Sequence, residues 1–208
     1  KRFTGRRRRS GEPFTFGYIG THIPAKGVNL LIEAFAQLSA PAQLHIWGRN
    51  NGQSTQALQR MAALAPNQIA FMGEYENKQM LTRVFDRVDA IVVPSIWMEN
   101  SPLVIHEAQA CGVPVITADA GGMAEYVHHK VNGLLFRHRD MKSLSEQMAY
   151  AQAHPEEMKR LGRRGYLFSE DGQIPCIHAH VAELEQQYLS LIDSHQPSNS
   201  HPHVAHHP

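Results

Sequence analysis

Two glutamates that flank a helix start are the residues of this sequence most suited to chemistry. Glu99 and Glu107 lie eight residues apart, and Ser101 and Pro102 stand between them. A Ser-Pro pair favours a helix start, with Ser at the N-cap and Pro at the first helical position. The first amides of that helix would be unpaired at its positive end. An anion is their natural partner.

A diphosphate at this helix end would need a further cation, and Lys26 is the best candidate. It closes a loop with the sequence GTHIPAKG, residues 20–27. Helical side chains tilt toward the N-terminus, so the Glu107 carboxylate should flank an anion held by the amides of Leu103 and Val104. Carboxylates beside a phosphate accept hydrogen bonds from hydroxyls, such as sugar and ribose diols. Each residue alone is more typical of a solvated side chain, and only the combination indicates a site.

The hydropathy pattern predicts a scaffold for these residues, because short apolar runs alternate with helical patterns. This alternation is typical of an α/β fold with a doubly wound parallel sheet of the Rossmann kind. Ligands bind such sheets beyond the carboxyl ends of the strands, here the loops 20–27, 48–52, 95–102 and 118–122. The expected strands are 14–19, 43–47, 68–72, 90–94, 113–117 and 133–136, and the expected helices are 27–38, 54–64, 78–85, 102–111, 123–128 and the last third, 140–192.

Composition excludes several classes of protein. The 208 residues are 42% hydrophobic and 19% charged, which favours a folded domain over a disordered chain. No apolar run reaches the roughly 18 residues that span a bilayer, and no signal peptide is recognisable, so we expect a cytoplasmic protein. Two cysteines cannot form a disulfide framework or a four-thiolate zinc site. Neither G-x-G-x-x-G after the first strand nor a P-loop motif occurs, which argues against a dinucleotide oxidoreductase and a P-loop NTPase.

The two ends of the sequence differ from its body. Residues 1–13 hold six basic residues, and we expect a solvated basic linker, since no aromatic residues accompany the arginines as in many nucleic-acid-binding segments. No nucleic-acid partner is therefore expected. Residues 194–208 hold five histidines and three prolines and should form a disordered tail without a functional metal site. The folded domain is expected at 14–193, and the first residue, a lysine, suggests a piece of a longer protein.

Over residues 14–191 the sequence resembles the C-terminal, donor-binding domain of a family 4 (group 1) retaining glycosyltransferase of the GT-B fold. The combination of motifs is specific, although each motif alone is not. They are FTFGYIG at 14–20, the Lys-Gly pair at 26–27 followed by LIEAF, VDAIVVPS at 88–95, ENSPLVIHEAQACGVPVI at 99–116, AGGMAEYV at 120–127 and NGLLF at 132–136.

The resemblance implies a role for each candidate residue. Lys26 would neutralise the diphosphate of a nucleotide sugar, Glu99 would contact the transferred sugar, and Glu107 would contact the ribose. Lys26 and Glu99 would be the catalytic residues, and no cofactor or metal would be required, in keeping with the lack of a D-x-D motif. The loop 73–75 would lie against the base. The donor-binding residues implied are Gly20, Thr21, His22, Lys26, Gly73, Glu74, Tyr75, Glu99, Asn100, Ser101, Leu103, Val104 and Glu107.

Two departures from the family pattern affect these expectations. Many members have an arginine after the first-loop glycine, where this sequence has Thr21 and His22. A protonated His22 or Arg49 would have to replace it, or diphosphate binding would be weaker. The resemblance also implies an N-terminal Rossmann-like domain that is missing here, to which a helix at 176–192 would cross back. We therefore expect the chain to bind donor but to turn over poorly alone.

The leading hypothesis is retaining, metal-independent transfer of a sugar from a nucleoside diphosphate to an unknown acceptor. A nucleotide-sugar epimerase or a sugar phosphorylase on the same architecture is the alternative enzyme. If the protein is not an enzyme, the alternative is a module that binds a nucleotide sugar without catalysing its transfer. The expected partners are the donor, the acceptor and the missing domain, and a peripheral membrane contact through the full-length enzyme is left open.

Overall fold

The computed structural model describes residues 6, 11–39, 41–170, 172, 174 and 176–194. Its contacts divide the chain into two compact units, with the boundary between residues 174 and 175. The expected domain at 14–193 extends past this boundary, so the two units are described separately. Most of the expected basic linker and all but the first residue of the expected tail lie outside the described residues.

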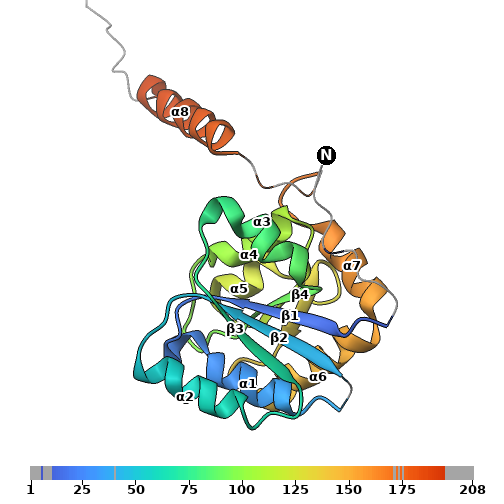
Figure 1. Cartoon of the computed structure of the whole chain (residues 1–208). Coiled ribbons are helices and arrows are strands. Elements are labelled where there is room, and N and C mark those ends of the chain that lie inside the picture. Colours follow the sequence, from blue (N-terminus) through green and yellow to red (C-terminus); the bar gives the residue numbers. More distant parts are fainter. Residues whose placement is uncertain are drawn as a thin grey trace, which may run out of the picture. The chain divides into compact units, whose positions relative to one another are not determined.

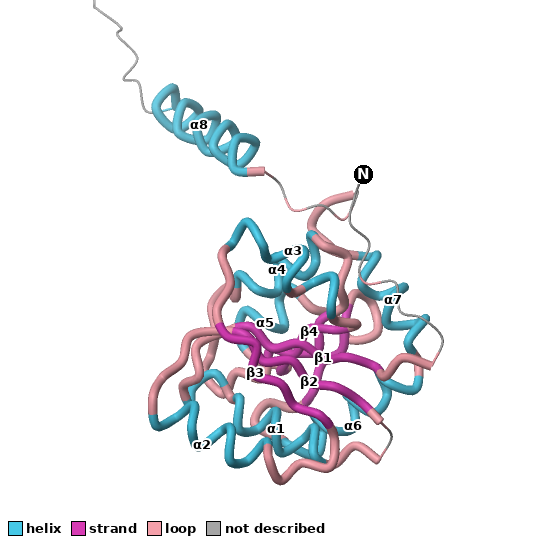
Figure 2. Tube along the Cα trace, viewed as in Figure 1, coloured by secondary structure: helices cyan, strands magenta, loops and turns pink. Residues whose placement is uncertain are grey.

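The first unit contains one sheet of six parallel strands, which is drawn in magenta in Figure 2. The strand order is β3-β2-β1-β4-β5-β6, the doubly wound order of a Rossmann sheet, so the expected fold class is confirmed. The order reverses between β1 and β4, where such sheets bind ligands. The strands are β1 Phe14–Ile19, β2 Ala42–Trp47, β3 Gln68–Gly73, β4 Ala90–Val93, β5 Val115–Ala118 and β6 Gly133–Phe136.

Helices cover both faces of this sheet (Figure 1). Helices α1, α2 and α6 lie on one face, and α3, α4 and α5 lie on the other. Helix α7 contacts α4, α6 and β6. The bounds are α1 Val28–Ala36, α2 Gln53–Ala62, α3 Met80–Arg83, α4 Leu103–Ala110, α5 Gly121–Tyr126, α6 Met141–Ala153 and α7 Pro155–Arg164, with 3₁₀ turns η1 Pro24–Lys26, η2 Asn77–Gln79 and η3 Phe85–Arg87.

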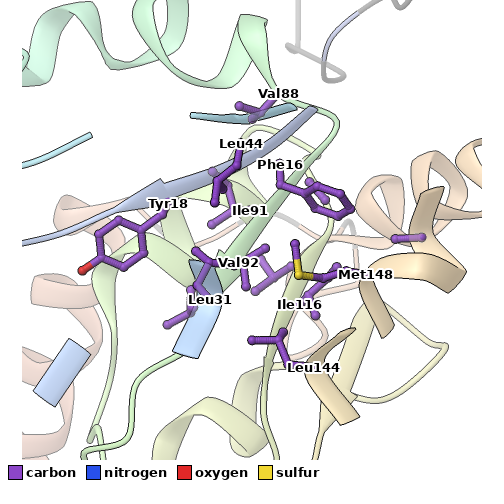
Figure 3. Packing of buried hydrophobic residues seen from close by; sticks show 14 of the residues in the cluster. Phe16, Tyr18, Leu31, Leu44, Val88, Ile91, Val92, Ile116, Leu144 and Met148 are labelled. Atoms are coloured by element: carbon purple, nitrogen blue, oxygen red, sulfur yellow. The ribbon is translucent and has the colours of Figure 1, made fainter. Parts of the chain in front are cut away.

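The core forms because every strand residue of β4 and β5 is buried between the two helical layers. Such strands have near-continuous apolar sequences, AIVV and VITA here. Figure 3 shows how the helices close one face: Leu31 of α1 and Leu144 and Met148 of α6 lie beside Val92 and Ile116 of the strands. All five side chains are fully buried.

Three local expectations differ from the structure. The helix expected at 78–85 is a short α3 between two 3₁₀ turns. Ser101 was expected to cap α4, but Pro102 occupies the N-cap and no side chain caps this end. The reason is that the Ser101 hydroxyl hydrogen-bonds His106 instead. The expected helical last third is interrupted at 165–170, directly after α7.

The second unit contains helix α8, Ile177–Ser194. Apolar residues recur on it at intervals of three or four, which places them along one stripe. They are Ile177, Val181, Leu184, Tyr188 and Leu191. Across the described part of the chain, none of the helices is both long and apolar enough to cross a membrane.

Truncation of a buried side chain in the interior strand β5 should destabilise the fold more than truncation at the surface. Ile116→Ala should lower the free energy of unfolding by about 2–5 kcal/mol, because it opens a cavity in a fully buried layer. Leu64→Ala, at a side chain that is 87% exposed, should change it by less than about 0.5 kcal/mol. Urea denaturation of both variants checks this, and equal losses would contradict the described core.

Candidate functional site

A cavity of about 330 Å³ opens at the carboxyl ends of β1 and β4, where the strand order reverses. The end of β1, the turn η1, the loop after β4 and the start of α4 form its wall. Its lining residues are Tyr18, Ile19, Gly20, Lys26, Val93, Pro94, Ser95, Glu99, Ser101, Pro102, Leu103 and Val104.

An ion pair between Lys26 and Glu99 spans this cavity. Lys26 Nζ lies 2.7 Å from Glu99 Oε1. Ser95 Oγ lies 2.8 Å from the same carboxylate oxygen and 3.1 Å from the Ala25 carbonyl, and its single hydrogen has the charged oxygen as the nearer acceptor. The Lys26 side chain is 39% exposed and Glu99 only 14%. The carboxylate is therefore fixed in the wall, and the ammonium group remains accessible to a ligand.

Two glycines allow the loops that carry this pair to approach each other. Gly27 has a φ of 69°, and a Cβ on it would collide with the Pro94 carbonyl. Gly122, at the start of α5, donates its N–H to the Glu99 carbonyl at 2.8 Å. A Cβ on Gly122 would collide with the Asn100 carbonyl. Residues with side chains at these positions would push the loop after β4 away from η1 or α5.

A second support for this loop comes from residues that the sequence analysis missed. Arg139 donates to the Ile96 carbonyl from Nη2 at 3.0 Å and from Nε at 3.2 Å. His138 Nε2 lies 3.2 Å from the same carbonyl, and its backbone N–H donates to Asp119 at 2.7 Å. The available signal was the charged run RHRD directly after β6, because that run had to lie at the same edge of the sheet.

Tyr18 is another cavity residue that the sequence analysis missed. It is 2% exposed, and its hydroxyl donates to the Thr21 carbonyl at 3.1 Å. Burial, and secondly the negative charge of Glu99, raise the pKa of Tyr18 far above its ordinary value. The phenol therefore stays neutral and fixes the first turn of the loop 20–27.

Glu107 does not line the cavity, and it is half-buried on α4. Burial raises the pKa of Glu107. Burial, and secondly the Glu107 charge, raise the pKa of Tyr75 to about 12. The cavity therefore joins Lys26 with Glu99 and leaves Glu107 outside its lining.

His22 does not join the cavity. It is 3% exposed, its Nδ1 lies 3.1 Å from Thr55 Oγ1, and Thr55 Oγ1 accepts from the Asn51 N–H at 2.9 Å. Burial lowers the pKa of His22, which disfavours the protonated form expected to replace the missing arginine. Arg49 is exposed, and its carbonyl accepts from the His22 N–H.

The predicted residues thus fall into two groups in the structure. Those that line the cavity together are Gly20, Lys26, Glu99, Ser101, Leu103 and Val104. Those that do not line it are Thr21, His22, Gly73, Glu74, Tyr75, Asn100 and Glu107. Within the described ranges, no cluster of three or more His, Cys, Asp or Glu residues is arranged to hold a metal ion.

Comparison with known proteins shows which family contains the sequence that forms this cavity. The family model of glycosyl transferases group 1 matches residues 3–168. The chain belongs to this family. The cavity of this group 1 glycosyltransferase chain therefore lies within the matched segment, as do Lys26, Glu99 and Glu107.

Curated relatives are longer than this group 1 chain. A GDP-mannose-dependent monoacylated alpha-(1-6)-phosphatidylinositol monomannoside mannosyltransferase of Corynebacterium glutamicum is 32% identical over 152 residues, which cover 69% of this chain and 39% of that protein. A D-inositol 3-phosphate glycosyltransferase of Geodermatophilus obscurus is 31% identical over 176 residues, covering 77% of this chain and 39% of that protein. The chain thus spans about two fifths of the length of these relatives.

Solved structures show the same fold. Anabaena HepE in complex with UDP and glucose superposes with a TM-score of 0.72 at 23% identity, covering 88% of this chain and 48% of that one. Sucrose-phosphate synthase from Thermosynechococcus elongatus superposes with a TM-score of 0.71 at 24% identity, covering 90% and 47%. The expected resemblance to one half of a GT-B fold is confirmed at the level of architecture.

Because burial raises the pKa of Glu107, we predict that removing the charge of this side chain stabilises the folded state of the group 1 chain. A carboxyl whose pKa is higher in the folded than in the unfolded chain contributes stability at low pH, and loses that contribution as the pH rises through its folded-state pKa. Glu107→Gln, neutral at every pH, should therefore have a higher free energy of unfolding than the parent at pH 7. The advantage should shrink as the pH falls toward about 4.

Urea denaturation at several pH values measures this difference. Glu33→Gln, on the exposed side of α1, is the matched control and should change the free energy of unfolding by less than about 0.5 kcal/mol. A Glu107→Gln variant that is less stable than the parent at pH 7 would show that the carboxylate is stabilised by contacts rather than destabilised by burial.

Proposed function

We propose that this chain is the donor-binding part of a glycosyltransferase that uses a nucleoside-diphosphate sugar. In the reaction, the bond between the anomeric carbon and the diphosphate oxygen breaks, and its electron pair leaves with the nucleoside diphosphate. A hydroxyl oxygen of the acceptor bonds to the anomeric carbon, and its proton passes to the departing diphosphate and from there to solvent. Retention of anomeric configuration is proposed from the family resemblance.

The observation that carries this proposal is the Lys26–Glu99 pair at 2.7 Å, inside a cavity that the start of α4 also lines. Negative charge builds on the diphosphate as its bond to the sugar breaks. The Lys26 ammonium group, once paired with the diphosphate, and the unpaired amides of a helix start stabilise that charge as it develops. These groups supply positive charge themselves, so we propose that the transfer needs no metal ion or cofactor.

The comparisons support a nucleotide-sugar donor. The printed name of one relative specifies GDP-mannose, and solved HepE structures contain UDP, glucose or UDP-glucose. These descriptions differ in base and sugar, so the donor of this chain is proposed only as a nucleoside-diphosphate sugar. The acceptor, a cytoplasmic location and a peripheral membrane contact through the full-length enzyme stay predictions from the sequence.

The roles of the other predicted donor-binding residues are proposed from the family resemblance. The Glu99 carboxylate would exchange its contact with Lys26 for a hydroxyl of the bound sugar, and the freed ammonium group would pair with the diphosphate. As the resemblance implies, Glu107 would accept hydrogen bonds from the ribose, and Tyr75 would lie against the base. We assign no phosphate contact to His22.

Calorimetric titration of the chain with UDP, GDP and ADP tests this function. One of them should bind, and Lys26→Ala should weaken that binding by about ten-fold or more, because a charge-assisted hydrogen bond contributes roughly 1.5–3 kcal/mol. Lys78→Ala is the matched control, since Lys78 is an exposed lysine paired with Glu76 outside the cavity. Indifference of the parent chain to all three nucleotides would refute the proposal.

Glu99→Gln should separate the sugar contact from the phosphate contact. The variant lacks the carboxylate that competes for Lys26, so it should bind the nucleoside diphosphate at least as tightly as the parent. It should also lose the added affinity of the parent for the corresponding nucleotide sugar. Titration of both ligands measures this, and equal weakening for both would assign Glu99 a structural role.

A further inference from the structure

We propose that His106 is a positioning residue that orients the Ser101 hydroxyl, so that Ser101 donates its hydrogen to the diphosphate of the bound donor. The inference rests on the proposed function. It adds one hydrogen-bond donor to the donor site, the Ser101 hydroxyl, and names His106 as the residue that orients it. It concerns a pair of side chains on α4 and the loop before it, in addition to the lysine and the backbone amides.

The two side chains form a hydrogen bond at the rim of the cavity. Ser101 Oγ lies 2.9 Å from His106 Nε2. Ser101 is exposed and lines the cavity together with Lys26 and Glu99. It leaves the N-cap of α4 to Pro102, so its hydroxyl is not used to pair a helix amide. A ligand in the cavity can therefore reach it.

The direction of this hydrogen bond follows from the other ring nitrogen. His106 Nδ1 is buried and has no hydrogen-bond partner among the described residues. A hydrogen on Nδ1 would be a buried donor without an acceptor, and such groups are rare and costly. The hydrogen of the neutral ring is therefore on Nε2, which donates to Ser101 Oγ. The hydroxyl hydrogen of Ser101 is then available to another acceptor.

Aromatic packing fixes the ring in this position. The His106 ring meets Tyr126 edge-on at a centroid distance of 4.4 Å and Tyr166 at 6.1 Å. Tyr126 and Tyr166 themselves stack at 6.4 Å, so α4, α5 and the segment after α7 all contribute to the contact. Burial lowers the pKa of His106, which favours the neutral ring near pH 7.

An oriented Ser101 hydroxyl can stabilise the diphosphate as this leaving group gains negative charge. The ring can only donate to Ser101, so the serine cannot turn its own hydrogen back toward the histidine. The hydrogen is directed toward the anion before the reaction begins, and the hydrogen bond strengthens as the diphosphate oxygen becomes more negative. Donors fixed in this way act without reorganisation during bond cleavage.

Nucleotide binding by single and double variants tests the coupling. Ser101→Ala should weaken binding of the nucleoside diphosphate by about ten-fold, as expected for a lost hydrogen bond to a charged group. His106→Leu keeps the hydroxyl but removes the group that orients it, so it should also weaken binding, by no more than Ser101→Ala does. The double variant should bind no more weakly than Ser101→Ala alone, because His106 acts only through the Ser101 hydroxyl. His106→Gln, whose amide can still donate, should recover part of the affinity.

Two controls separate positioning from a structural effect. Tyr126→Phe keeps the ring that packs against His106 and should bind as the parent does. Thermal unfolding of every variant shows whether the fold is retained at the titration temperature. Losses that add in the double variant, or a His106→Leu variant that binds as the parent does, would overturn the proposal. If Ser101→Ala binds normally while Lys26→Ala does not, the donor site stands and only this inference fails.

Nuclear magnetic resonance gives a readout that is independent of affinity. Long-range ¹H–¹⁵N correlation in the free chain should show the hydrogen of His106 on Nε2. A hydrogen on Nδ1 would overturn the inference even if binding were impaired by Ser101→Ala. If the parent binds none of the three nucleotides, the proposed function fails and this inference fails with it.

Discussion

The Lys26–Glu99 ion pair is the interaction on which the rest of the site depends. It joins the loop after β1 to the loop after β4, across the point where the strand order reverses. In the free chain each charge satisfies the other, so a cation can be kept in the cavity without a ligand. A partly exposed ion pair contributes little to stability. The ion pair instead positions the lysine side chain in the cavity, where an anion of higher charge than the Glu99 carboxylate, such as a diphosphate, can bind it.

The loop after β4, which carries Glu99, is held in place for this ion pair by hydrogen bonds to two of its backbone carbonyl groups. Gly122 binds the Glu99 carbonyl from α5, and Arg139 binds the Ile96 carbonyl from the segment after β6. Neither contact is made by a residue that we expect to touch the donor. The cavity geometry thus depends on segments that follow β5 and β6 as well as on β1 and β4, so a single β-α-β unit would not supply it.

The sequence predicted the sheet and the cavity better than it predicted individual side chains. Strands such as β6 were predicted to the residue, because apolar runs between turns are local signals. Lys26 and Glu99 were expected to line one anion-binding site, because each follows a strand at the same edge of the sheet, but their direct ion pair was not predicted. Ser101 was expected to cap α4, and the error arose because His106, five residues later, competes for its hydroxyl. That competition depends on the packing of three elements and has no local signature.

Burial of polar groups gives the reason for the remaining differences. His22 was expected as a phosphate ligand, because the sequence shows that it follows Gly20 but not that Thr55 of α2 and Phe71 of β3 enclose it. Its Nε2 is buried without a hydrogen-bond partner among the described residues, as is His106 Nδ1. Unpaired buried nitrogens are unfavourable for folding. At His106 the unpaired Nδ1 fixes the tautomer, and the Ser101 hydroxyl hydrogen is thereby free to point into the cavity. At His22 the paired nitrogen Nδ1 attaches the loop after β1 to Thr55 of α2, and the unpaired Nε2 has no comparable role. Two buried histidines with the same deficit thus differ in what their paired nitrogen does, and only tertiary packing decides which.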